Sequence, residues 1–473
     1  MEANFTMITY SFSNIGSDFL YTHLYKCIKK DILKGTLHPG EKLPSKRSLS
    51  KNLNISIITI ENAYAQLIAE GYVYSIPKKG YFVTDITTID TKKESMISTE
   101  NIQISSGKSN YFADFTSNQT QSEHFPFSIW AKLVREILTQ NQPDLMTNPP
   151  SGGIFPLREA IAKHLKDFRN MTVSPKQIII GAGTEYLYGL IIQLLGFKKK
   201  YAVEDPGYHK ISQIYKSHCV PCNFVSIDSS GVRITELEEN NIDIVHISPS
   251  HHFPTGTIMP ISRRYELLGW ASKSESRYII EDEYDSEFRL SGQPIPTLQS
   301  IDVQEKVIYI NTFTKTLAST VRISYMVLPK HLVDKFYSTL YFYSCTVSNL
   351  EQYILARFIN EGYFEKHINR MRNYYHSKRD KLLYTIKNSP LADYVTISEE
   401  NAGLHFLLKI KTELSDKEFL QKMERSGIKL SSLSQYYQNS PEDAAHNFVM
   451  NYSFVPEENL EKAIQILYKG IMM

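Results

Sequence analysis

Apolar positions near the start of the chain follow a helical period and are interrupted by turn residues. Leu24, Ile28 and Ile32 recur every four residues, which predicts a first helix with one buried face. Pro39-Gly40 then ends this stretch with a turn. The pattern predicts a small helical unit before the longer remainder of the chain.

Two further helices follow at a spacing typical of a helix-turn-helix. Ser45 is positioned to cap the second helix, in which Leu49 and Leu53 point inward. Ser56 is positioned to cap the third helix, which ends at Gly71. Its predicted buried face is made by Ile60, Ala63, Tyr64 and Leu67. The outer face of the second helix is basic, with Lys46, Arg47 and Lys51.

A hairpin with a basic tip is predicted after the third helix. Residues 72–75 and 81–84 have the composition of strands and flank Pro77-Lys78-Lys79-Gly80. Residues 20–84 contain ten Lys or Arg against four Asp or Glu, although the whole chain has a net charge of only +2. The plainer interpretation is a small helical cap that happens to be basic.

Binding to DNA requires cations and helix amides for the phosphates and a helix that enters the major groove. Because this stretch has both, we expect residues 14–84 to be a winged helix that binds double-stranded promoter DNA. The expected contact residues are Ser45, Lys46, Arg47, Ser56, Thr59, Lys78 and Lys79.

The segment from Leu24 to Val83 resembles a GntR-type winged helix, in particular through LPSKR, ENAYAQL and EGY. One position departs from that family. Ile57 follows the serine that opens the recognition helix, where the family usually has an arginine. The operator sequence therefore does not follow from the resemblance.

A tether and a second, larger body are predicted next. Residues 85–109 are rich in Thr, Ser, Lys, Glu and Asp with little apolar periodicity, which is typical of a flexible linker. From about residue 110 to 473, short β-rich runs alternate with helical stretches. The runs are residues 177–181, 201–204, 242–248, 278–282, 307–311 and 324–328. This alternation predicts an α/β sheet covered by helices on both faces.

Ligands in such sheets bind where the strands end, so the residues after each run are the candidate site. Ala182-Gly183-Thr184 opens a helix with free amides that suit a phosphate. The later runs are followed by an aromatic ring, two histidines, an acid, a phenol, a lysine and an arginine. These are Tyr208, His251, His252, Asp282, Tyr284, Lys315 and Arg322, with Thr312 just before the lysine.

Together these groups match what is needed to hold pyridoxal 5'-phosphate (PLP). Lys315 would form the Schiff base, Asp282 would pair with the pyridine nitrogen and Tyr284 would hydrogen-bond the phenolic oxygen. The phosphate would be held by Gly183, Thr184, Thr312 and Arg322. Each residue alone has a plainer interpretation: a solvated lysine, a core tyrosine, or, for the acidic run 281–287, a surface face or a divalent-metal site.

The order and spacing of these motifs resemble fold-type I aminotransferases over roughly residues 111–473. With the winged helix in front, the chain is similar to the MocR/GabR family of PLP-dependent transcription regulators. The matching segments are SGGIFPLREAIAKHL, EDPGYHK, SPSHHFPTG, IIEDEYDSEFR and TFTKTLASTVRISY.

This resemblance implies roles for the site residues. Lys315 would be the internal aldimine lysine, Asp282 the pyridine partner, Tyr284 the phenolate contact, Tyr208 the stacking ring and Arg322 a phosphate ligand. It also implies a mixed, mostly parallel sheet, a smaller C-terminal α+β subdomain from about residue 331, and a homodimer.

Two positions depart from working aminotransferases. Phe253 replaces the asparagine that usually precedes Pro-Thr-Gly, so His251 or His252 would have to supply a substitute contact. Residues 447–454 contain no arginine, although aminotransferases place there the one that grips the substrate carboxylate. Arg289 or Arg425 would have to take over that task.

Three functions remain open. In the first, an amine or amino acid reacts at Lys315 and changes how two winged helices bind DNA. In the second, PLP itself is the signal. In the third, the protein is an aminotransferase for an amino acid and carries a DNA-binding passenger, which the missing arginine argues against.

Composition adds the expected compartment. No apolar run approaches the roughly 18 residues that span a bilayer, and the N-terminus lacks the features of a signal peptide. We expect a cytoplasmic protein with no membrane contact. The four cysteines, Cys27, Cys219, Cys222 and Cys345, are too scattered for a disulfide framework. Cys219 and Cys222 form a CxxC without a second ligand pair, so no metal is expected.

Overall fold

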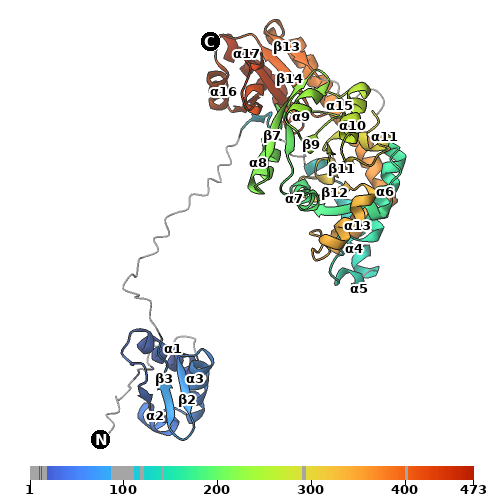
Figure 1. The fold of residues 1–473 in the computed structure, drawn as a ribbon. Helices are drawn as coiled ribbons and strands as arrows, with labels where there is room; N and C mark the ends of the chain where they lie inside the picture. Colours follow the sequence, from blue (N-terminus) through green and yellow to red (C-terminus); the bar gives the residue numbers. More distant parts are fainter. Residues whose placement is uncertain are drawn as a thin grey trace. The chain divides into compact units, whose positions relative to one another are not determined.

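The protein has two compact units, Met1–Lys108 and Ser109–Met473 (Figure 1). The computed structural model describes residues 10, 12, 19–86, 111–117, 122–140, 142–289, 295–399 and 403–472. The start of the expected DNA-binding domain at residue 14 and nearly all of the expected tether 85–109 therefore lie outside the described residues.

The first unit contains the three predicted helices, α1 (Leu20–Leu33), α2 (Lys46–Leu53) and α3 (Ile57–Ala69). Both predicted caps are confirmed, because the hydroxyls of Ser45 and Ser56 accept hydrogen bonds from the Ser48 and Thr59 amides, each at 3.1 Å. The predicted apolar faces are buried together in one core, made by Leu24, Ile28, Ile32, Leu49, Ile60, Ala63, Tyr64 and Leu67.

The predicted hairpin is also present, shifted by about one residue. β2 (Val73–Ile76) pairs antiparallel with β3 (Gly80–Val83), and the exposed Lys78 and Lys79 lie in the turn between them. A third strand, β1 (Lys42–Leu43), pairs with β3 and was not predicted, because two residues carry no periodicity. The first unit is thus a winged helix.

The second unit is built on an eight-stranded sheet with the order β5-β12-β11-β10-β9-β6-β7-β8. The strands are β5 (Ile178–Ala182), β6 (Tyr201–Asp205), β7 (Cys222–Asp228), β8 (Gly231–Val232), β9 (Ile244–Ile247), β10 (Tyr278–Glu283), β11 (Val307–Thr312) and β12 (Ile323–Val327). β12 runs antiparallel to both neighbours and β8 runs antiparallel to β7, while the other pairs are parallel. The expected mixed, mostly parallel sheet is therefore confirmed.

Helices cover both faces of this sheet, as predicted. One face packs against α6 (Phe155–Arg169), α14 (Asn349–Asn360), α4 (Phe127–Gln140), α9 (Ile234–Glu239), α10 (Ile261–Ser272) and α11 (Leu298–Ile301). The other packs against α7 (Thr184–Leu195), α8 (His209–Ser217) and α13 (Lys330–Thr339). The short helices α5 (Gln142–Leu145) and α12 (Phe313–Thr316) lie in connections.

The C-terminal part forms a smaller α+β subdomain. Its sheet has the order β13-β14-β17-β16 and consists of β13 (Val395–Ser398), β14 (His405–Ile410), β16 (Ser431–Ser432) and β17 (Asn447–Asn451). It packs with α15 (Tyr363–Lys387), α16 (Asp416–Arg425) and α17 (Leu460–Met472). The expected subdomain range from about residue 331 also includes α13 and α14. The structure places these two helices in the core of the large sheet instead.

A short strand connects the start of the second unit to this subdomain. β4 (Ala113–Asp114) pairs parallel with β15 (Ile428–Lys429), more than three hundred residues later in the chain. Phe115 is buried in the subdomain core, and its carbonyl accepts a hydrogen bond from the Asn451 amide at 3.0 Å. In the described part of the chain, no helix is long and apolar enough to cross a membrane.

Candidate functional site

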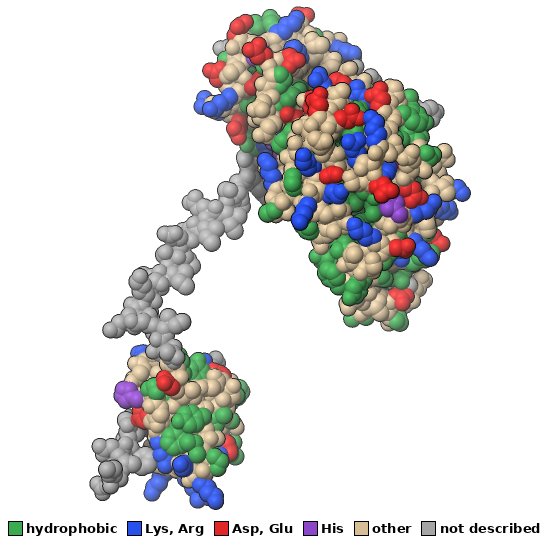
Figure 2. Space-filling model, in the orientation of Figure 1, with side chains coloured by type: hydrophobic (Ala, Val, Ile, Leu, Met, Phe, Trp, Pro, Cys, Tyr) green, Lys and Arg blue, Asp and Glu red, His purple; other side chains and the backbone are tan. Residues whose placement is uncertain are grey.

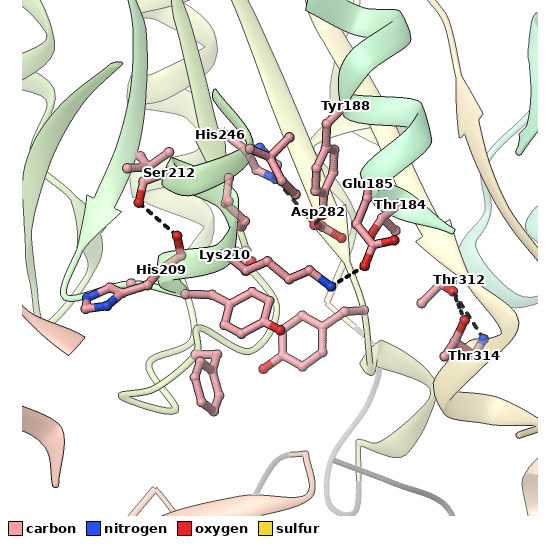
Figure 3. Close-up of a pocket in the computed structure, with 18 of the residues that line it drawn as sticks. Thr184, Glu185, Tyr188, His209, Lys210, Ser212, His246, Asp282, Thr312 and Thr314 are labelled. Carbon is pink, nitrogen blue, oxygen red and sulfur yellow. Dashed lines mark hydrogen bonds and ion pairs between the residues drawn. The ribbon is translucent and has the colours of Figure 1, made fainter. Parts of the chain in front are cut away.

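A cavity of about 680 Å³ opens in the second unit at the ends of the parallel strands (Figure 3). Its wall contains seven of the predicted cofactor residues: Thr184, Tyr208, Asp282, Tyr284, Thr312, Lys315 and Arg322. The eighth, Gly183, lies directly beside Arg322. A side-chain Cβ at this position would be only 2.4 Å from the guanidinium, so there is no room for one. The structure therefore brings together residues that are separated by more than a hundred positions in the sequence.

Asp282 lies buried at the end of β10, and one of its oxygens is held by the protein. Tyr188 of α7 donates a hydrogen bond to Oδ2, and Nε2 of His246, on β9, lies 3.3 Å from the same atom. Both side chains point at Asp282 in Figure 3. The other oxygen, Oδ1, has no hydrogen-bond partner among the described residues, although it is buried. Burying a carboxylate oxygen without a hydrogen-bond partner costs free energy, so this atom is suited to a ligand that donates a hydrogen bond to it.

The support of Asp282 extends one residue further. Nδ1 of His246 lies 2.8 Å from the Tyr215 hydroxyl, so the imidazole is held at both nitrogens. Sequence reasoning missed Tyr188, His246 and Tyr215. The sequence showed only that His246 lies within a predicted strand, residues 242–248, and the register of this strand beside β10 is seen in the structure alone.

Glu281, Glu283 and Asp285 of the acidic run are buried as well and Glu287 is half-buried, so the interpretation of this run as a surface face is wrong. Glu281 lies 3.5 Å from Arg264 and accepts hydrogen bonds from the amides of Leu298 and Gln299. Asp285 lies 2.8 Å from His251. Within the described ranges, no group of three or more His, Cys, Asp or Glu residues is arranged to hold a metal ion.

Lys315 follows β11 on the short helix α12 and is partly buried at the cavity wall. Burial lowers its pKa to about 8, while the negative charge of Asp285 opposes this shift. A lysine in this state has a larger neutral fraction at neutral pH than an ordinary lysine has. Its amine is therefore better prepared to attack an electrophilic carbon.

The predicted phosphate cradle lies at the N-terminus of α7. Gly183 precedes this helix with a φ of 91°, a conformation that favours glycine, and no side chain caps the helix there. Arg322 is ion-paired with Glu185 at 2.5 Å, and Glu185 also pairs with Lys210. A hydrogen-bonded group of hydroxyls adds to this corner and is made by Thr312, Thr314 and Ser324. Glu185 and Lys210 were not predicted, although Glu185 directly follows Thr184.

The two predicted tyrosines lie at different depths. Tyr208 is 46% exposed at the rim, where its ring meets that of Phe253 edge-on at 5.8 Å. The hydroxyl of Tyr284 donates to the carbonyl of His251 at 2.9 Å. Burial raises the pKa of Tyr284, so the hydroxyl stays protonated. Tyr208 is thus accessible for stacking, while Tyr284 is anchored.

The suggested substitutes for the missing aminotransferase contacts do not reach the cavity. Neither His251 nor His252 belongs to its wall, and both are buried beside the carboxylates of Asp285 and Glu204. Arg289 lines a separate small cavity, and Arg425 is exposed at the end of α16. Of the described residues that line the large cavity, Arg322 is the sole arginine.

The predicted DNA-binding residues lie at the starts of α2 and α3 and in the turn of the wing. Figure 2 shows Lys and Arg side chains grouped at the end of this unit near α2. Arg47, Lys78 and Lys79 are exposed, whereas Lys46 pairs with Glu61 of α3 at 2.5 Å. The hydroxyls of Ser45 and Ser56 cap their helices, and that of Thr59 lies 2.8 Å from that of Ser56.

Both units match known protein families. Residues 20–83 match the bacterial regulatory proteins of the gntR family, and residues 112–467 match the class I and II aminotransferases. The uncharacterized HTH-type transcriptional regulator YdeL of Bacillus subtilis is 38% identical over 448 residues, which cover 95% of this chain and 96% of the relative.

Two more distant matches extend this comparison. The HTH-type pyridoxine biosynthesis transcriptional regulator PdxR of Corynebacterium glutamicum is 27% identical over 421 residues, which cover 88% of each chain. The crystal structure of Pyrococcus horikoshii kynurenine aminotransferase in complex with PMP is similar with a TM-score of 0.66 and 23% identity, covering 77% of this chain and 91% of that one. The latter likeness concerns the fold of the second unit.

Proposed function

The chain belongs to the HTH-type transcriptional regulators that join a GntR-type winged helix to an aminotransferase class I and II domain, and we propose that it is a DNA-binding regulator. Its second unit holds PLP and senses an amine, an amino acid or PLP itself. The observation that carries this proposal is Oδ1 of Asp282, which is buried and has no hydrogen-bond partner among the described residues, in the cavity that also contains Lys315.

The residues of the cavity fit this cofactor. PLP supplies an aldehyde that condenses with primary amines and a ring that withdraws electrons. Oδ1 of Asp282 would accept a hydrogen bond from the protonated ring nitrogen, and Tyr188 and His246 would keep the carboxylate in place through Oδ2. Lys315 would hold the aldehyde carbon, because its lowered pKa favours the neutral amine.

The remaining groups would fix the phosphate and the ring. The α7 amides at Gly183 and Thr184 would bind the phosphate together with Arg322 and Thr312. Tyr208 would stack on the ring from the accessible rim, and Tyr284 would face the phenolic oxygen.

The cavity favours a sensor over an aminotransferase. An efficient transaminase usually orients the substrate carboxylate with an arginine, and the one arginine in the described wall of the cavity, Arg322, is assigned to the phosphate. The regulator of pyridoxine biosynthesis among the relatives supports PLP itself as one candidate signal.

We further propose the arrangement in which this signal is used. Residues 14–84 form the DNA-binding domain, 85–109 the tether, and 110–473 the effector domain. Two copies associate as a homodimer, because a two-fold pair of winged helices matches two half-sites of promoter DNA. The protein acts in the cytoplasm.

A spectroscopic titration combined with DNA binding tests the proposal. The purified full chain is titrated with PLP and then with a panel of amines and amino acids, while visible absorbance and promoter binding are followed together. An absorption band that requires Lys315, together with a change in DNA affinity, is the expected result. If only amines alter both quantities, the effector is an amine; if PLP alone alters DNA binding, PLP is the signal.

Two outcomes would contradict the proposal. Rapid transfer of an amino group to a keto acid, with no effect on DNA affinity, would identify an aminotransferase. A band that survives in Lys315→Ala would remove that lysine from its proposed role.

A further inference from the structure

The start of the recognition helix carries two exposed isoleucines, and one of them, Ile57, stands where the GntR-type family usually has an arginine. Ile57 and Ile58 form the first two positions of α3 and are 46% and 69% exposed. They take no part in the core of the winged helix, which uses Ile60, Ala63 and Tyr64 of the same helix. Single exposed apolar residues are common, but two adjacent ones at the groove-facing end of a recognition helix need an explanation.

The helix period places these side chains on the surface that faces away from the core. Ile58 and Asn62 lie one turn apart, and both are exposed. Glu61 is on the same exposed side, but its carboxylate is paired with Lys46 of α2 at 2.5 Å. The only acid in the first two turns of α3 is therefore neutralised by an ion pair, so it does not repel a nucleic acid.

Exposed cations lie on the two elements that flank α3 in the sequence. Arg47 and Lys51 are exposed on α2, and Lys78 and Lys79 are exposed in the turn of the wing. Such cations suit the phosphates beside a groove, while the helix itself meets the base edges. The occupant of the isoleucine surface is therefore the floor of the major groove rather than another protein.

The chemistry of the groove identifies what two isoleucines can read. Among the base edges in the major groove, the C5-methyl group of thymine is the apolar feature. An asparagine amide matches the donor and acceptor of adenine, which is the partner of thymine. We propose that Ile57 and Ile58 read thymine methyl groups in the major groove, so that this regulator selects A·T base pairs at the positions that the start of α3 meets.

The test removes the methyl groups from the DNA and leaves the protein intact. The full chain is used to enrich duplexes from a random DNA pool, and each thymine of the enriched duplex is then replaced in turn by uracil. Uracil keeps the same pairing and the same O4 acceptor but lacks the methyl group. At one or more positions per half-site, the dissociation constant should rise about fourfold, which corresponds to about 0.8 kcal/mol for one buried methyl group.

Protein variants show which side chains are responsible. Ile57→Ala and Ile58→Ala should remove the difference between thymine and uracil at their positions, while the salt dependence of binding should not change. Both residues are exposed, so neither substitution opens a cavity in the core. Ile68→Ala, an exposed position at the far end of the same helix, is the matched control and should keep the discrimination.

Several results would overturn this inference: no uracil substitution weakens binding, no common sequence is enriched, or both variants still discriminate thymine from uracil. The inference rests on DNA binding by the proposed regulator, which is tested separately by salt-dependent binding to any duplex. Loss of all DNA binding would therefore refute the regulator, whereas binding without discrimination would refute only the thymine reading.

Discussion

The reactivity of Lys315 is set by its burial, and this can be measured on the protein without any cofactor. Burial lowers the pKa of this lysine from 10.5 to about 8. At pH 7 this shift raises the fraction of neutral amine about 300-fold over that of an unperturbed lysine. Because only the neutral amine is a nucleophile, we expect Lys315 to react at a lower pH than exposed lysines do.

Trace labelling with acetic anhydride measures this directly. The cofactor-free protein is labelled from about pH 6 to about pH 11, and peptide mapping gives the extent of acetylation at each lysine. Labelling of Lys315 should reach half of its maximum near pH 8. Asp285→Asn should move this midpoint to a lower pH, because the charge of Asp285 raises the pKa of Lys315.

Lys378 provides an internal control. Burial lowers its pKa to about 8 as well, but it is fully buried on α15 and is not part of the cavity wall. It should therefore be labelled slowly at every pH, which separates a lowered pKa from access to the reagent. A midpoint for Lys315 near pH 10.5, or labelling of Lys378 as fast as that of Lys315, would refute the reasoning.

Three further predictions concern other groups. Asp282→Asn should weaken PLP binding about 10- to 100-fold in a spectral titration, because a hydrogen bond to a charged group contributes about 1.5–3 kcal/mol; unchanged affinity would contradict the role of Oδ1. Arg47→Ala with Lys78→Ala should reduce the slope of log affinity against log salt by about 1.8 if each side chain contacts one phosphate. Burial raises the pKa of Glu204 from 4.5 to about 8, so the folded chain keeps a proton there that the unfolded chain loses. The stability that this group contributes is therefore lost as the pH rises from about 4.5 to about 8, and Glu204→Gln should raise the melting temperature relative to wild type at pH 9 but not at pH 4.

The features that followed from local pattern were predictable from the sequence. Helix faces such as Leu24, Ile28 and Ile32 repeat with the helical period because burial requires it, and Ser45 and Ser56 cap helices through contacts only three residues away. The strands in the middle of the large sheet were found because both of their faces are buried, which makes them continuously apolar.

The features that depend on distant packing were not predictable. β7 lies near the edge of the sheet, and its residues alternate little in burial, so its sequence has no clear strand pattern. β1 is only two residues long and forms a strand because it pairs with β3. Tyr188 and His246 meet at Asp282 only because the fold brings α7 and the neighbouring strands β9 and β10 together. Likewise, α13 and α14 belong to the large core because the apolar face of α13 packs with α7 and that of α14 packs with α6. The periodicity of each helix predicts an apolar face but not the element against which it packs.

The pairing of β4 with β15 determines where the chain enters the second unit. The polypeptide that comes from the DNA-binding unit first pairs with a strand beside the small subdomain, and not with the large sheet. Asp114 and Lys429, which lie in this pair, also belong to the cavity wall. A ligand in the cavity would therefore lie beside the strand pair through which the chain from the DNA-binding unit enters, so the covalent link between the two units begins at the wall of the site itself.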